Sequence, residues 1–223
     1  MQYPSSWLKG SSLGESIAAE LRLQIINGSI KPGVVLSENR IAADFGTSRS
    51  PVREALKTLS GEGLITLQRM GAVVNGLSLQ DIEELYDVRY LIESFAWQRV
   101  STDPVELISQ LEQIVDKMEL AGKYHDVVEF AYQDLCFHES IITEAKHTRI
   151  LHLWTSIRQI VMTVMLITTN DVLSQGEQKI KYVVNKHRKL LRGLESRNND
   201  IILHNVEEYF ADSHRTLHTS IPK

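Results

Sequence analysis

The sequence predicts a mainly α-helical protein of two domains: an N-terminal winged helix-turn-helix with a small β-hairpin wing, and a C-terminal all-α helical bundle. Two short helical patterns separated by a glycine turn precede a stretch of alternating apolar residues, and no such alternation recurs after residue 76. The 223 residues also exceed the usual length of one domain, about 100 to 150. The expected boundaries are residues 1–75 for the first domain, 76–78 for a linker and 79–223 for the bundle.

The first expected helix covers residues 13–27, because apolar side chains recur there at four-residue intervals. These side chains are Leu13, Ile17, Leu21 and Ile25. Gly28 ends the pattern, and a short apolar run at residues 34–36 predicts a brief strand.

A helix-turn-helix is expected next. Ser37 is a favourable N-cap for a helix over residues 38–45, which Gly46 ends after two turns. Ser50 is expected to cap the following helix, with Pro51 at its first position, where a missing N–H costs nothing. A short helix, a glycine turn and a new helix start are typical of this motif.

The second of these helices carries a basic face. Arg49, Arg53 and Lys57 recur every fourth residue and therefore lie on one side, near the helix N-terminus. An arginine can bind guanine at two points, and recognition helices contact bases through their first residues. Arg49 and Arg53 are thus the best candidates for base reading, and the alternative is a solvated basic surface. The turn before the helix and the wing after it favour DNA recognition.

A two-stranded wing is expected after the helix. Residues 64–67 alternate in polarity, residues 68–71 form a turn, and residues 72–74 return. Arg69 lies at the tip, where a cation is well placed for the DNA backbone or the minor groove. The alternative is an ordinary surface arginine.

The charge is distributed unevenly along the chain. The net charge is −4, but residues 1–75 carry eight Lys and Arg against six Asp and Glu, whereas the remainder carries 16 against 22. Any phosphate contact is therefore expected in the N-terminal third.

The composition also indicates the cellular compartment of the protein. Cys136 is the only cysteine, which fits a reducing environment. The N-terminus lacks the apolar run of a signal peptide. The longest apolar stretch, residues 160–167, is far shorter than the roughly 20 residues that cross a bilayer. We therefore expect a cytoplasmic protein that does not bind a membrane.

The bundle contains one pattern with metal-binding chemistry. The helices are expected at about residues 79–101, 104–121, 125–145, 148–170, 174–197 and 199–218. Asp134 and His138 are four residues apart, so a carboxylate and an imidazole share one helical face and form half of a divalent-metal site. His187, on a later helix, can complete three ligands. Most Asp–His pairs at this spacing are only surface neighbours.

Several of these motifs resemble the winged-helix domain of GntR-family bacterial transcription regulators. They are Leu36-Ser37-Glu38, the SRSPVREAL run of residues 48–56, and Glu62-Gly63-Leu64-Ile65. The resemblance implies that the start of the second helix, the start of the recognition helix and the wing contact operator DNA. With the residues discussed above, the expected contact set is Ser37, Asn39, Ser48, Arg49, Ser50, Pro51, Arg53, Arg69 and Gly71. Many relatives have arginine where Asn39 stands, so this contact is expected to be weaker here.

Past the wing the chain resembles the FadR-type effector domain called FCD. Metal-binding members of that family use an Asp, a His four residues on, and two further histidines, and the first three map onto Asp134, His138 and His187. The fourth ligand position does not match. Where the last histidine of the family would fall, 22 residues beyond His187, this chain has Tyr209. The resemblance implies a divalent metal, such as Zn, Ni or Mn, held by the three matching residues.

The resemblance also implies an effector site in the bundle. Arg89 matches a recurrent family arginine whose guanidinium can pair with the carboxylate of an acidic effector, although a salt bridge with Glu93 is equally compatible with its position. Tyr209 can donate a hydrogen bond to a bound acid. The expected effector site comprises Arg89, Asp134, His138, His187 and Tyr209.

The function implied is that of a homodimeric transcriptional repressor. It is expected to read an inverted repeat in double-stranded operator DNA and to be released by a small organic acid, with gluconate as the first candidate. The alternatives are a regulator or activator that responds to lactate, a hexuronate or a fatty acyl group. An enzyme is not expected, because the sequence contains neither an HExxH motif nor a nucleophile elbow.

Overall fold

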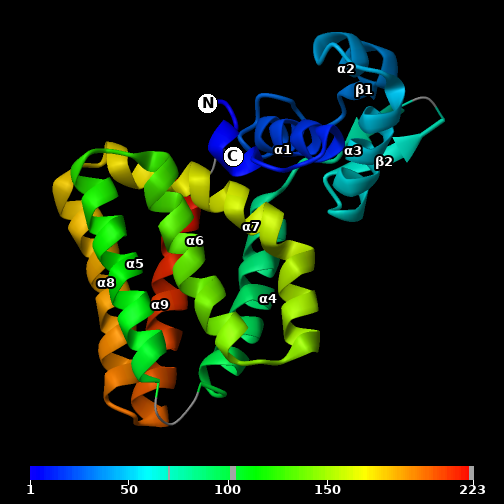
Figure 1. Ribbon diagram of the computed structural model, residues 1–223. Coiled ribbons are helices and arrows are strands. Elements are labelled where there is room, and N and C mark those ends of the chain that lie inside the picture. The colour runs from blue at the N-terminus through cyan, green and yellow to red at the C-terminus, as the bar shows by residue number, and fades with distance from the viewer. Residues whose placement is uncertain (70, 101–103, 221–223) are drawn as a thin grey trace. The chain divides into compact units, whose positions relative to one another are not determined.

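The structure, a computed structural model, describes residues 1–69, 71–100 and 104–220 (Figure 1). It divides into two compact units, one formed by Met1–Ser78 and the other beginning at Leu79, and each is described by itself. The predicted fold class is confirmed: a winged helix-turn-helix with a small antiparallel sheet, and a separate unit built of helices.

The N-terminal unit follows the predicted order of elements. They are η1 (Ser5–Leu8), α1 (Leu13–Ile26), β1 (Val35–Ser37), α2 (Glu38–Asp44), α3 (Arg49–Gly61), β2 (Ile65–Gln68) and β3 (Gly71–Val74). Helix α1 begins with a capping box, in which Ser12 and Glu15 each bind the other's backbone N–H. Helices α1 and α3 pack together, and their buried apolar faces form the core of this unit.

Two local predictions in this unit were wrong. Leu13 is 49% exposed, because it is the first residue of α1 and lies beyond the buried stripe that starts at Ile17. The N-cap of α3 is Ser48 rather than Ser50, and its side chain makes no capping hydrogen bond. Pro51 is therefore the third helical residue, which is still within the first turn, where a backbone N–H has no intrahelical acceptor.

The predicted strand and wing join in one antiparallel sheet with the order β1-β3-β2. Ser37 pairs with Gly71 across β1 and β3, and Gln68 pairs with Gly71 across β2 and β3. Gly71 has a φ of 155°, and a Cβ at this position would lie 2.0 Å from the backbone oxygen of Leu36. Only glycine allows β3 to approach β1 so closely, so Gly71 permits the tip end of the wing to pair with β1.

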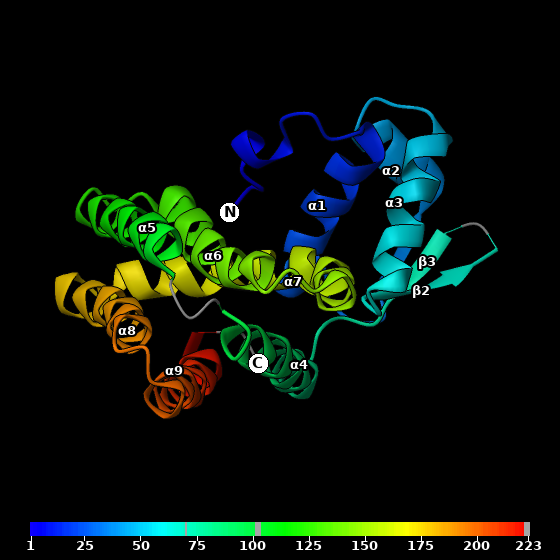
Figure 2. The ribbon, with the colours of Figure 1, turned by 60° about the horizontal axis from the view of Figure 1, so that its bottom comes forward.

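The C-terminal unit consists of α4 (Leu79–Trp97), α5 (Val105–Lys123), α6 (Val127–Glu144), α7 (Thr148–Ser174), α8 (Glu177–Glu195) and α9 (Asn199–Ser220). In Figure 2, α5, α8, α9 and α4 follow one another around the unit, each beside the next. Helix α6 packs against α4, α5 and α7. The polar residues of the candidate site lie on the inward faces of α4, α6, α8 and α9.

Helix α7 is the one described helix that is long and apolar enough, by length and composition, to cross a membrane. Half of its most apolar window is buried within the structure, where α7 packs against α4, α6, α8 and α9. Core helices of soluble proteins show the same features, so this helix is weak evidence for a membrane span.

Candidate functional site

Most of the residues expected to contact DNA lie at the surface of the N-terminal unit. The exposed ones are Asn39, Ser48, Arg49, Ser50, Arg53 and Arg69. Ser37 and Pro51 are half-buried, and Gly71 is buried in the sheet. Helix α3 thus presents its N-terminal side chains to solvent, as a recognition helix requires.

An unpredicted carboxylate, Glu38, organises the basic face of α3. Its Oε2 accepts hydrogen bonds from Nε and Nη2 of Arg49, at 2.9 and 2.6 Å, and from Nε of Arg53, at 3.0 Å. The hydrogen bond from Arg49 is the main cause that lowers the pKa of the Glu38 carboxyl. The arginine side chains stay about half exposed, at 46% and 55%. Glu38 therefore holds the two guanidinium groups beside each other without removing them from solvent.

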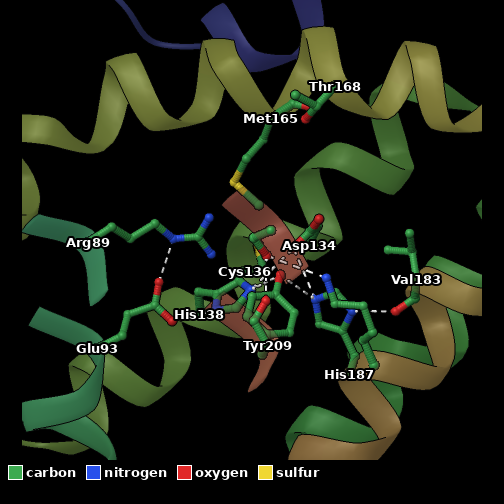
Figure 3. A network of polar contacts seen from close by, with 12 residues as sticks. Arg89, Glu93, Asp134, Cys136, His138, Met165, Thr168, Val183, His187 and Tyr209 are labelled. Atoms are coloured by element: carbon green, nitrogen blue, oxygen red, sulfur yellow. Dashed lines mark hydrogen bonds and ion pairs between the residues drawn. The ribbon is translucent and has the colours of Figure 1, made fainter. Parts of the chain in front are cut away.

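A buried polar cluster occupies the centre of the C-terminal unit (Figure 3). It contains the five residues predicted for the effector site, together with Glu93, and comes from four helices. Its members are Arg89 and Glu93 on α4, Asp134 and His138 on α6, His187 on α8, and Tyr209 on α9, each 9% exposed or less. His204 and His214 lie elsewhere, paired with Glu208 and Asp87.

Hydrogen bonds define the tautomers of the two histidines. Nδ1 of His138 lies 2.5 Å from Oε2 of Glu93, and Nδ1 of His187 lies 2.9 Å from the carbonyl oxygen of Val183. Both partners only accept hydrogen bonds, so each Nδ1 carries a proton, and a ring without a second proton has its lone pair on Nε2. Burial, with the charge of Asp134, raises the pKa of Tyr209 well above its ordinary value, so its hydroxyl donates to Nε2 of His138 at 2.9 Å.

The two Nε2 atoms face a third acceptor. Oδ1 of Asp134 lies 3.4 Å from Nε2 of His138 and 3.1 Å from Nε2 of His187. Burial alone would raise the pKa of the Asp134 carboxyl, but its interactions with His187 and His138 outweigh burial and lower the pKa. The 3.1 Å approach of Asp134 Oδ1 to His187 Nε2 needs a cation between the two atoms, either a proton or a metal ion. Two imidazole nitrogens, each oriented by a hydrogen bond, and one carboxylate oxygen fit a divalent metal.

Arg89 is both paired and incompletely satisfied. Its Nε donates to Oε1 of Glu93 at 2.6 Å, so the salt bridge considered from the sequence exists. Its Nη2 is buried and has no hydrogen-bond partner among the described residues. Burial would lower the pKa of Arg89, but Glu93 raises it above its ordinary value, so the group is a cation. A buried guanidinium with a free N–H is suited to a ligand carboxylate.

A small cavity of about 50 Å³ lies beside Arg89, Asp134 and Tyr209. Its further lining includes Met165, Thr168, Thr169, Lys186 and Ser213. At about 10 to 15 Å³ for each water, this volume holds only a few waters. A ligand of several carbons requires the surrounding helices or side chains to move.

The comparisons with known proteins agree with both units. Residues 13–74 match the model of bacterial regulatory proteins, gntR family, and residues 84–211 match the FCD domain. The gluconate operon transcriptional repressors of Bacillus licheniformis and Bacillus subtilis (strain 168) are each 38% identical over 211 residues, which cover 94% of this chain and 87% of the relative. The chain belongs to the gntR family. This gntR-family protein is therefore a transcriptional regulator and not an enzyme.

Solved structures show the same fold. Escherichia coli McbR/YncC is 18% identical, with a TM-score of 0.67 over 93% of this chain and 98% of that one. A GntR regulator from Rhodococcus sp. RHA1 is 22% identical, with the same TM-score and coverage.

Two residues of the candidate sites were not predicted, Glu38 and Glu93. Glu38 lies 11 and 15 residues before the arginines that it holds, and Glu93 lies 45 residues before His138. Glu93 had a partial signal, since it was considered as a partner of Arg89, but no local spacing connected it with a histidine.

Proposed function

We propose that this regulator represses a gluconate-utilisation operon and that gluconate releases it from operator DNA. The two Bacillus relatives that are named for the gluconate operon are similar over 94% of this chain. The observation that carries the proposal is the buried Arg89, which lines the small cavity of the C-terminal unit and whose Nη2 has no hydrogen-bond partner among the described residues. An organic acid provides the carboxylate that this group lacks. We further propose that the protein acts in the cytoplasm, where the operator DNA is.

The polar cluster suits a hydroxylated acid. The carboxylate of the effector would bind Arg89, and its hydroxyls would meet Thr168, Thr169 and Lys186 on the cavity wall. Asp134, His138 and His187 would hold a divalent ion such as Zn, Ni or Mn. When bound, such an ion supplies a positive charge that attracts the oxygen atoms of the effector.

The DNA contacts are proposed for α2, α3 and the wing. Arg49 and Arg53 would read bases in the major groove from the first turns of α3, while Arg69 would contact the backbone or the minor groove. A homodimer would place two recognition helices on an inverted repeat with half-sites about one helical turn apart.

The size of the cavity supports a mechanism for release. A six-carbon sugar acid does not fit into about 50 Å³, so it binds only to a conformation in which the cavity is larger. An effector shifts an equilibrium by its difference in affinity for the two states. We propose that the enlarged state holds the two winged helices of a dimer in an arrangement that does not match the operator.

The same small volume favours one alternative effector. Lactate, a three-carbon hydroxy acid, needs less expansion of the cavity than gluconate does. Calorimetric titrations of gluconate, lactate and a hexuronate into the purified regulator distinguish these ligands. We expect gluconate to bind, and His138→Ala to weaken it. Binding of lactate alone would replace gluconate as the effector, and equal gluconate affinity in His138→Ala would place the site elsewhere.

Substitution of Arg53 tests the DNA-reading assignment. Arg53→Ala should weaken operator binding by about 1 to 3 kcal/mol, which is roughly 5- to 150-fold, because a bidentate base contact is lost. Lys57→Ala, one turn further along the same face, is the matched control and should affect all DNA sequences equally. A gel-shift titration that shows unchanged operator affinity in Arg53→Ala would remove Arg53 from the recognition surface.

A further inference from the structure

We propose that Tyr209 is a fourth ligand of the metal ion, so that the site consists of Asp134, His138, His187 and Tyr209. This inference rests on the proposed three-residue metal site and extends it. Tyr209 stands where the family pattern has a histidine, so its phenol oxygen would replace an imidazole nitrogen as a metal ligand.

The position of the Tyr209 hydroxyl matches that of a ligand. Its oxygen lies 2.9 Å from Nε2 of His138 and 3.5 Å from Nε2 of His187. The carboxylate oxygen of Asp134 lies 3.4 and 3.1 Å from the same two nitrogens. Tetrahedral ligands with bonds of about 2.0 to 2.1 Å are roughly 3.3 to 3.4 Å apart. The phenol oxygen thus stands in the same relation to the two imidazoles as the carboxylate oxygen does.

Metal binding removes the present hydrogen bond of Tyr209. The hydroxyl donates to the lone pair of His138 Nε2, and a metal ion would take that lone pair. Tyr209 is only 7% exposed, so a hydroxyl left without a partner would be costly. Coordination avoids this cost. The O–H bond breaks, a metal–oxygen bond forms, and the proton leaves to solvent, as protons do when ligands bind metals.

A bound metal would balance the charge of an anionic phenolate. Nζ of Lys186 lies 4.5 Å from the centre of the Tyr209 ring, over its face, but it is already paired with Asp212 at 2.6 Å. A phenolate and the Asp134 carboxylate together neutralise a divalent ion, while Glu93 is already balanced by Arg89 at 2.6 Å. The buried site would therefore carry no net charge, which limits the cost of burying the ion.

The test is a titration of Zn²⁺ into the metal-free full-length protein, followed in two ways. Ultraviolet difference spectra detect an ionised phenol, and competition with a chelator gives the zinc affinity. We expect a phenolate band that saturates with the bound zinc. Tyr209→Phe should lose the band and bind zinc at least about tenfold more weakly, since even groups that contact ligands indirectly contribute 10- to 100-fold.

Two further variants separate coordination from a structural role. Tyr124→Phe removes a 71% exposed tyrosine and should keep both the band and the affinity. Tyr209→His restores the histidine of the family pattern, so it should bind zinc tightly without the band. Failure of Tyr209→His to recover affinity that Tyr209→Phe has lost would count against direct coordination.

The outcomes separate this inference from the proposed function. Zinc binding that needs His138 but is unaffected by Tyr209→Phe, or that produces no phenolate band, would overturn the inference and leave the three-residue site intact. Absence of zinc binding to the unsubstituted protein would overturn both the inference and the proposed metal. Operator binding, measured on the same samples, tests the regulator function independently of either result.

Discussion

The buried interactions of Glu93 allow a quantitative prediction about the C-terminal unit. Glu93 is fully buried, and its two oxygens accept hydrogen bonds from Arg89, at 2.6 Å, and from His138, at 2.5 Å. Glu93→Gln keeps the shape of the side chain but removes its charge and turns an NH₂ group toward one of the two donors. The cation of Arg89 then stays buried without a counter-charge.

The cost follows from burial. Removing one partner of a buried ion pair destabilises a protein by about 3 to 5 kcal/mol, because the other charge is left uncompensated. This is a large part of the roughly 5 to 15 kcal/mol that stabilises a typical domain. At about 2 kcal/mol per M of urea, the unfolding midpoint should fall by on the order of 1 to 3 M.

Urea unfolding monitored by tryptophan fluorescence measures this effect. Trp97 and Trp154 are buried in the C-terminal unit, so their emission reports on it. Glu177→Gln is the matched control, since Glu177 and Lys181 have the same four-residue spacing and the same 2.6 Å separation as the Arg89–Glu93 pair but are 79% and 65% exposed. We expect a much smaller shift in the control. Equal urea midpoints in the two variants would refute the claim that burial makes the Arg89–Glu93 ion pair important for the stability of the C-terminal unit.

Three further results are expected. Gly71→Ala should destabilise the N-terminal unit and weaken operator binding, because its Cβ would lie 2.0 Å from a backbone oxygen of β1; an unchanged thermal midpoint would contradict this. Glu38→Gln should lower the ratio of operator to random-DNA affinity in gel shifts at fixed salt, because the two arginines of α3 lose the carboxylate that positions them and a nearby negative charge is removed. An unchanged ratio would exclude a positioning role. Burial alone would raise the pKa of Asp212, but interactions led by the hydrogen bond from Lys186 outweigh burial and lower the pKa. This carboxylate therefore stabilises the fold above its ordinary pKa of about 3.9, and the contribution is lost as the pH falls below that value. Asp212→Asn should reduce the loss of stability that the protein shows at acid pH.

Local spacing was sufficient to predict the winged helix and part of the buried polar cluster. The pattern of residues 48–56 predicted a helix with arginines at its start, and the structure begins α3 at Arg49. The four-residue spacing of Asp134 and His138 predicted a shared face, and both side chains point into the buried cluster. These predictions succeeded because helical geometry alone determines which side chains share a face.

Contacts between distant helices were beyond local reasoning. Glu93 meets His138 across 45 residues, and Tyr209 meets His138 across 71. No periodicity connects such pairs, because the packing of α4, α6 and α9 determines them. The volume of the cavity also depends on this packing. The cap of α3 was misplaced for another reason: Ser48 and Ser50 are both suitable cap residues by type, and the sequence alone does not distinguish them. In the structure Ser48 is the N-cap, although its side chain makes no capping hydrogen bond.

The central claim is that one regulator holds operator DNA and releases it when an acid binds at Arg89. The most direct measurement is the dissociation constant of the protein for its operator, with and without saturating gluconate, in the unsubstituted protein and in Arg89→Lys. The lysine keeps a positive charge beside Glu93 but removes the free guanidinium arm. We predict that gluconate weakens operator binding by the unsubstituted protein and has little effect on the variant. An operator affinity that gluconate leaves unchanged in the unsubstituted protein, or lowers equally in both, would contradict the account.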